Sequence, residues 1–203
     1  MKLLGGMVSR GRERPAPSRG RQPEVVELSA GEILHRFYTA KREPIFFDTS
    51  TMGRFNAPDG SYGVLYAAKE IAGAFAETFL RTPGRTLIDA NLLQRKAYLR
   101  FSTNRNLKLI RFAGPGLARI GATAEVSHSG LPYDVPQVWS EALYKHPVES
   151  DGIAYHSRHD DAELCYALFD RAADAVVETE RRTDLDQDWF WQIAESYGVG
   201  FAP

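Results

Sequence analysis

Three side chains within residues 53–80 could together bind and act on an anionic aromatic ligand. Arg54 precedes a Pro-Asp-Gly turn, Tyr66 lies in a short apolar run, and Glu77 follows further along. A guanidinium binds phosphate through charge-assisted hydrogen bonds, and a tyrosine ring stacks on an aromatic cation. A carboxylate stabilises positive charge that develops during a reaction. We therefore interpret this stretch as half of an active site.

A strand and a helix are predicted to position these side chains. Residues 62–67 read as a strand, and residues 69–80 read as a helix because apolar residues recur at helical spacing. Glu77 lies off this apolar stripe, where a solvated glutamate is the ordinary explanation. Gly73, one turn earlier on the same flank, costs about 1 kcal/mol relative to alanine inside a helix. This glycine indicates room for a ligand. The core-facing stripe is predicted to contain Ile71, Ala74, Phe75 and Thr78.

Two further polar residues lie in or next to predicted strands. Arg36 lies inside the apolar run 33–38, and Ser157 lies near the end of the predicted strand 151–158. A buried guanidinium without a partner is costly, so Arg36 needs one. Its partner is either a carboxylate of the core or a phosphate of a ligand, and both alternatives are open at this point.

The rest of the chain mixes short strands with scattered helices. There is no regular alternation of strand and helix, which favours the α+β class over α/β. Further strands are predicted at residues 25–28, 96–101, 107–112, 164–169 and 176–179, and helices at residues 134–146 and 189–197.

Charge is unevenly distributed along the 203 residues. Residues 1–21 carry a net charge of +5, which leaves −6 on the rest because the total is −1. We expect a flexible basic tail over residues 1–24 and one folded domain over residues 25–203. The tail either docks on an anionic partner or serves as a solubilising extension. An acidic body argues against direct nucleic-acid binding by the domain.

Several classes of site and location are disfavoured. Cys165 is the one cysteine, which excludes an internal disulfide and fits a reducing compartment. No apolar run approaches the length of a membrane span, so we expect a cytoplasmic protein. Fingerprints of dinucleotide folds, phosphate loops, zinc proteases and serine hydrolases are absent. His156 and His159 lack an evident third ligand, so no metal is expected.

A set of short motifs, taken together, resembles the RES domain family over about residues 30–180. The motifs are Arg36 in its strand, Gly53-Arg54-Phe55-Asn56, Leu65-Tyr66-Ala67-Ala68, Glu77, and Gly152-Ile153-Ala154-Tyr155-His156-Ser157. The resemblance implies a fold similar to ADP-ribosyltransferases, with short mixed strands in a split sheet core and surrounding helices. It also implies a toxin of a bacterial toxin–antitoxin pair that consumes NAD or transfers ADP-ribose from it.

The resemblance assigns roles to five residues. It implies that Arg36, Arg54, Tyr66 and Ser157 bind NAD, and that Glu77, Arg36 and Ser157 take part in catalysis. Glu77 would stabilise the cationic ribose that forms when the nicotinamide bond breaks, as in glycoside hydrolysis. The chemistry needs no metal.

Three functions remain open from the sequence. The first is an NAD-degrading toxin of a type II system, with water or phosphate as acceptor. The second is ADP-ribosylation of a protein target, and the third is a non-catalytic NAD-binding module. The family implies a helix-turn-helix antitoxin as partner, in a complex of several chains.

Overall fold

The computed structural model describes residues 20–202 and confirms the predicted α+β class. The strands are β1 (Val25–Leu28), β2 (Ile33–Thr39), β3 (Val64–Ala68), β4 (Leu87–Asp89), β5 (Lys96–Thr103), β6 (Leu107–Arg111), β7 (Gly152–His156), β8 (Leu164–Phe169), β9 (Val176–Arg182) and β10 (Gly200–Ala202). The helices are α1 (Ile71–Phe79), α2 (Ala90–Gln94), α3 (Pro115–Ile120), α4 (Ala124–His128), α5 (Asp134–Tyr144) and α6 (Asp188–Ser196), and η1 (Asp170–Ala175) is a 3-10 helix.

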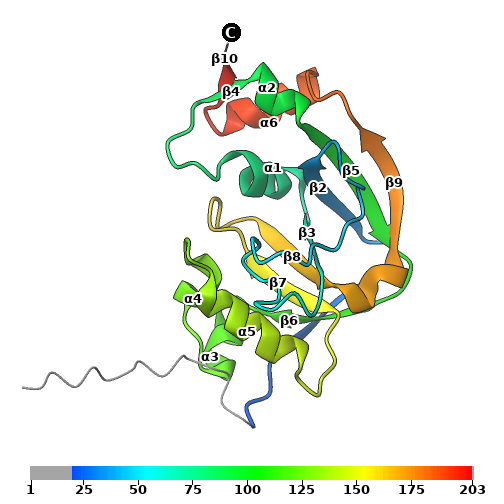
Figure 1. Ribbon diagram of the computed structural model, residues 1–203, viewed down its shortest axis with the longest axis vertical. Helices are drawn as coiled ribbons and strands as arrows, with labels where there is room; N and C mark the ends of the chain where they lie inside the picture. Colours follow the sequence, from blue (N-terminus) through cyan, green and yellow to red (C-terminus); the bar gives the residue numbers. More distant parts are fainter. Residues whose placement is uncertain (1–19, 203) are drawn as a thin grey trace, which may run out of the picture.

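Eight strands form one mixed sheet in the order β1-β6-β7-β8-β3-β2-β5-β9. The β6–β7 pair is parallel and the other neighbours are antiparallel. Figure 1 shows the sheet curling, with α1 and α6 toward one end and α3, α4 and α5 toward the other. Strands β4 and β10 form a separate parallel pair.

The sheet is narrowest at the junction of β2 and β3. Their register consists of the single pair His35–Ala68, after which the two strands diverge. The predicted split core is therefore wrong in its strict form, because the strands remain in one hydrogen-bonded sheet. Divergence at this junction still opens space between the two halves, and Arg36 and Tyr66 lie on the strands that border it.

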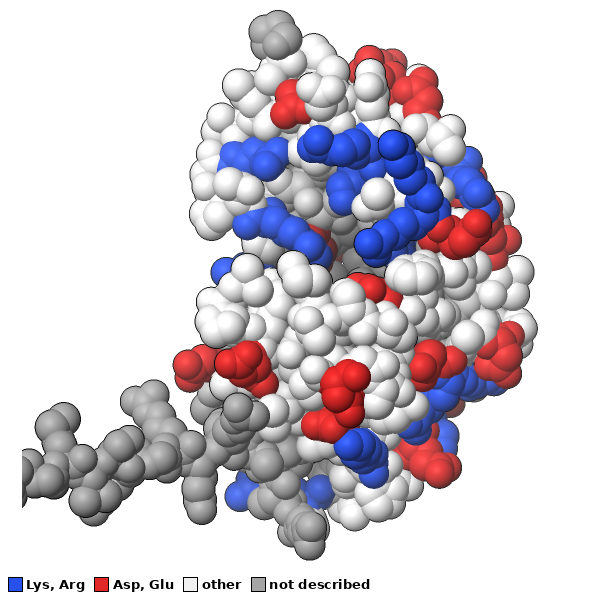
Figure 2. All heavy atoms as spheres, viewed as in Figure 1, with Lys and Arg blue, Asp and Glu red and all other residues white. Residues whose placement is uncertain are grey.

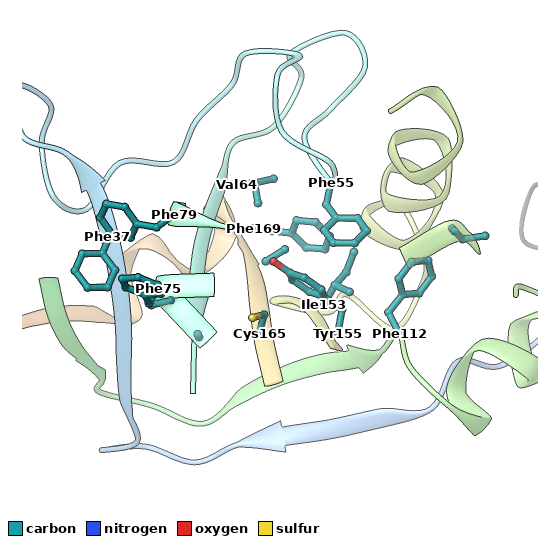
Figure 3. Packing of buried hydrophobic residues seen from close by; sticks show 14 of the residues in the cluster. Phe37, Phe55, Val64, Phe75, Phe79, Phe112, Ile153, Tyr155, Cys165 and Phe169 are labelled. Atoms are coloured by element: carbon teal, nitrogen blue, oxygen red, sulfur yellow. The ribbon is translucent and has the colours of Figure 1, made fainter. Parts of the chain in front are cut away.

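The predicted helix is confirmed as α1, whose apolar side packs against β2. Ala74, Phe75 and Phe79 are buried, and the Phe79 ring lies 5.2 Å from the ring of Phe37 in an edge-on arrangement. Figure 3 shows Phe37, Phe75 and Phe79 gathered at one end of the core. Phe79 replaces Thr78 of the predicted stripe as the buried residue. Aromatic packing therefore sets the position of α1, and with it that of Glu77.

The central strands are buried on both faces, which explains their nearly continuous apolar runs. Phe55, Tyr155 and Phe112 belong to the core cluster on the helix-covered side, where the rings of Phe55 and Tyr155 lie 4.9 Å apart. Strand residues that point to the opposite face of the sheet, such as Leu65 and Leu99, form a second cluster. Alternate side chains of a strand point to opposite faces, so one sheet supports both clusters.

The predicted tail lies largely outside the described residues, which exclude residues 1–19 and 203. Where the description begins, Arg21 donates a 3.3 Å hydrogen bond to the Ala118 carbonyl of α3. Glu24 forms a 3.0 Å ion pair with Arg111 of β6. Across residues 20–202, no helix has the length and apolar character needed to cross a membrane.

Candidate active site

A cleft opens where β2 and β3 diverge, and three adjoining cavities make it up. Their volumes are about 190, 130 and 230 Å³. Tyr66 and Arg81 line all three cavities, Arg36 lines two, and Glu77 lines two. Figure 2 shows Lys and Arg side chains bordering a hollow on this face of the molecule.

Glu77 of α1 is held by two of the predicted site residues. Its Oε1 accepts a 2.7 Å hydrogen bond from Ser157 Oγ, and its Oε2 lies 3.9 Å from Arg54 Nη2. Ser157 is fully buried just after β7, and its Oγ accepts a 3.1 Å hydrogen bond from the His159 backbone. Only 18% of the Glu77 side chain is exposed, so it is not a solvated helix glutamate.

Gly73 does not make room for a ligand, and that prediction is wrong. A Cβ at position 73 would lie 2.8 Å from Oε2 of Glu163 and 3.1 Å from Cβ of Ala68. The glycine instead lets the Glu163 side chain approach α1. Burial, and then the nearby Asp160 carboxylate, raise the pKa of Glu163.

Arg54 is buried, and its charge lies opposite Glu77. Its Nη1 donates a 3.1 Å hydrogen bond to the Ser127 carbonyl, and its Nε is shielded without a partner. Aromatic side chains surround the guanidinium, with Cζ between 5.8 and 6.0 Å from the ring centroids of Phe55, Tyr133 and Tyr155. Ring faces attract a cation, so this environment stabilises the charge inside the protein.

Tyr66 presents its ring to the cleft while its hydroxyl is anchored inside. The hydroxyl accepts a 2.7 Å hydrogen bond from the Phe55 backbone and donates one of 2.9 Å to Asn56 Oδ1. Burial raises the pKa of the Tyr66 hydroxyl well above its ordinary value. A Cβ at Gly53 would overlap the Asn56 amide, which explains the glycine before Arg54.

Arg36 projects into the cleft without a partner of its own. Its Nε and Nη1 atoms are shielded from solvent and have no hydrogen-bond partner. Burial lowers its pKa to about 10, although Tyr38 and Asp48 oppose the shift. Among residues 20–202, Arg36 forms no ion pair with a carboxylate. Of the two partners left open by the sequence, these contacts favour a ligand anion.

A family model described as RES domain matches residues 33–191. The chain belongs to the RES domain family. Its fold is similar to a chain in the crystal structure of the M.tuberculosis MbcT-MbcA toxin-antitoxin complex, with a TM-score of 0.65 at 12% sequence identity. The match covers 83% of this chain and 92% of that chain. No curated protein sequence matches the chain.

This RES domain therefore brings Arg54, Glu77 and Ser157 into contact and places Arg36 and Tyr66 on the same cleft. Their roles in binding and catalysis stay predictions. The Glu77 carboxylate and the Tyr66 ring line one cavity of the cleft, and Arg36 and Arg81 line the same cavity. Such a site suits a ligand that carries phosphates and develops positive charge near the carboxylate.

Sequence reasoning missed other side chains of the cleft. Arg81 follows Glu77 by one helical turn and donates a 2.8 Å hydrogen bond to its backbone carbonyl, so helical spacing was the signal for it. Lys96 reaches the cleft because β5 pairs with β2, which no local pattern shows. His159 lines the cavity that holds Arg54 and Glu77, and burial lowers its pKa.

Between residues 20 and 202, no three His, Cys, Asp or Glu side chains gather as a metal site requires. His156 and His159 follow one another closely in the chain but contact different groups. The His156 ring bonds to the Asp161 carbonyl, whereas His159 lines the cleft.

Proposed function

We propose that this RES domain protein is an NAD-degrading toxin of a type II toxin–antitoxin pair, cleaving the bond between nicotinamide and ribose. The observation that carries the proposal is the Glu77 carboxylate, held by Ser157 and Arg54 in a cleft bordered by cations. A carboxylate fixed in this way is ready to stabilise a ribose cation without further rearrangement.

The proposed reaction exchanges the nicotinamide for an oxygen nucleophile at the ribose C1′ atom. The pyridine nitrogen takes the electron pair of the broken bond, so nicotinamide leaves as a neutral molecule. Glu77 stabilises the oxocarbenium-like ribose that develops meanwhile. An oxygen of water or phosphate forms the new bond to C1′, and water then loses a proton to solvent.

The cleft also supports binding of the rest of NAD. The free guanidinium atoms of Arg36 suit the pyrophosphate, to which arginine donates paired hydrogen bonds. The Tyr66 ring, anchored through its hydroxyl, suits stacking on the cationic nicotinamide. An ADP-ribosyltransferase-like arrangement of the fold is part of the same proposal.

The partner we propose is a helix-turn-helix antitoxin that blocks the cleft in a complex of several chains. The similar solved chain comes from a structure described as a toxin-antitoxin complex, which supports an antitoxin partner here. We propose that the protein acts in the cytoplasm, where NAD is available, without direct binding to nucleic acid.

Nicotinamide release from purified protein tests the proposal. We expect the wild type to release nicotinamide and Glu77→Gln to lose about 100-fold or more in kcat, since it removes the transition-state charge. The glutamine oxygen still accepts the Ser157 hydrogen bond, so the fold should persist. Glu195→Gln changes an exposed glutamate of α6 and serves as the control. Intact NAD after long incubation with folded wild type would refute cleavage.

Labelled NAD separates the alternatives. If label from the adenosine part accumulates on a protein band of a lysate, the protein is an ADP-ribosyltransferase. If NAD binds without any turnover, the chain is a binding module. Release of labelled small products alone supports the proposed degradation.

A further inference from the structure

The far end of the cleft is a cationic pocket that neither Glu77 nor Ser157 lines. Four cations from four parts of the chain line it: Arg36 of β2, Arg42 of the following loop, Arg81 after α1, and Lys96 at the start of β5. Cations that share one pocket repel one another, so an anionic ligand is the natural occupant.

Four cations and two carboxylates, Glu43 and Asp48, line this pocket, which leaves a formal net charge of +2. Within residues 20–202, none of the four cations forms an ion pair. Asp48 also lines the pocket, but its carboxylate accepts hydrogen bonds from its own loop, and Glu43 is exposed at the rim. The unpartnered Nε and Nη1 atoms of Arg36 are shielded from solvent. Burial and then repulsion from nearby arginines lower the pKa of Lys96.

An aromatic ring completes the pocket. Phe46 lines it and is 39% exposed, with the Arg42 guanidinium 5.5 Å from its ring centroid. An exposed ring beside cations is the combination that stacks a nucleobase and binds its phosphates. The pocket therefore matches a phosphorylated nucleoside.

We propose that this pocket holds the adenosine end of a dinucleotide whose ribose carries an additional 2′-phosphate, so that NADP is preferred to NAD. The inference rests on the proposed function and specifies its substrate class. Arg36 and Arg81 suit the pyrophosphate, whereas the 2′-phosphate, which carries nearly two negative charges, suits Arg42 and Lys96, since these two line this pocket alone of the three cavities. Arginine accommodates this phosphate in other dinucleotide sites. Arg36 and Arg81 also line the cavity next to Glu77, which connects the two ends of the ligand.

Comparative kinetics test the inference. We expect kcat/KM for nicotinamide release to be about tenfold higher with NADP than with NAD, because a phosphate bound by two cations gains charge-assisted hydrogen bonds. Lys96→Gln and Arg42→Gln should each lower this ratio about tenfold. Lys108→Gln, which changes an exposed lysine of β6, should leave the ratio unchanged. A ratio at or below one, or a ratio that neither substitution moves, would overturn the inference.

A binding measurement keeps the inference separate from the proposed function. We expect 2′,5′-adenosine bisphosphate to bind at least tenfold more tightly than AMP in calorimetry, and Lys96→Gln to remove that difference. If neither dinucleotide is cleaved, the proposed function fails, and this comparison still decides about the pocket. Equal binding of the two nucleotides would overturn the inference whatever the catalytic result.

Discussion

At the scale of single residues, the cleft keeps charged groups in surroundings that do not favour them. Arg54 is buried among aromatic rings and Arg36 has shielded donors without partners, although each unmet donor costs stability. Natural proteins accept such costs where a ligand uses the groups. Glu77 differs from Arg36 in this respect, because Ser157 donates a hydrogen bond to its carboxylate.

Arg36 should therefore show opposite effects on stability and on binding. We expect Arg36→Gln to raise the melting temperature of the ligand-free protein, because it removes a buried charge without a partner. The same change should raise the Kd for NAD about 10- to 100-fold by removing charge-assisted hydrogen bonds. Thermal unfolding and calorimetry measure the two effects, with Glu77→Gln as the background for both so that NAD is not consumed. A lower melting temperature would mean that Arg36 has an internal partner.

Glu163 should make stability depend on pH. Burial and Asp160 raise its pKa in the folded state, so the folded protein binds this proton more tightly than the unfolded chain. Its contribution to stability is then complete below the unfolded pKa of about 4.5 and is lost as pH rises through the folded value.

Glu163→Gln removes this loss. The melting temperature of the variant should exceed that of the wild type at pH 7.5, and the difference should shrink toward pH 4.5. Thermal unfolding at several pH values checks this, with Glu195→Gln as control. A difference that stays constant with pH would contradict the assignment to Glu163.

At the scale of elements, the position of the site depends on strand contacts that place β7 and α1 on the same cleft. Gly152 begins β7 opposite Leu168 of β8. A Cβ there would overlap the Ala167 carbonyl oxygen and lie 3.0 Å from the Leu168 Cα, and backbone atoms of a central strand cannot move aside cheaply. The strand that ends just before Ser157 therefore requires glycine at its start.

Gly152→Ala should destabilise the protein by about 2–3 kcal/mol, the usual cost of forced overpacking. Gly200→Ala in β10 is a matched control, because its Cβ would make only an ordinary 3.9 Å contact with Leu87. That variant should change stability by less than about 0.5 kcal/mol. Chemical denaturation of both proteins measures the difference, and equal stability would show that β7 can move away from β8.

At the scale of the whole molecule, one curled sheet joins two lobes (Figure 1). The cleft lies where β2 and β3 diverge. The two strands that separate the lobes, β2 and β3, carry Arg36 and Tyr66. A partner that covers this opening would block every predicted site residue at once. This geometry suits control by a bound antitoxin.

Expression in cells should expose the activity of the uninhibited protein. We expect wild-type expression to lower cellular NAD and NADP and to stop growth, whereas Glu77→Gln should leave both near their normal levels. Extracted dinucleotides and growth curves measure this, at matched protein levels. If the wild type and Glu77→Gln stopped growth equally, the toxicity would not depend on the Glu77 carboxylate.

The sequence by itself determined the elements and the identity of the family. Apolar periodicity located β2, β3, α1 and β8 because such patterns arise from neighbours within a few residues. Ordered motifs around Arg36, Glu77 and Ser157 indicated the RES domain, which the family comparison then showed. The α+β class was predictable at this level, as was the set of residues that the fold brings to one cleft, whose roles stay predictions.

Only the tertiary structure decided which side chains meet. The contact of Glu77 with Ser157 joins residues 80 positions apart, and Lys96 enters the cleft through strand pairing. The same holds for Gly73, whose neighbour is Glu163 of a distant loop and not a ligand. Local patterns report which face of an element is apolar, whereas register and packing between distant segments decide what that face contacts. For this reason the free donors of Arg36, and the cationic pocket beyond them, were visible only in the folded chain.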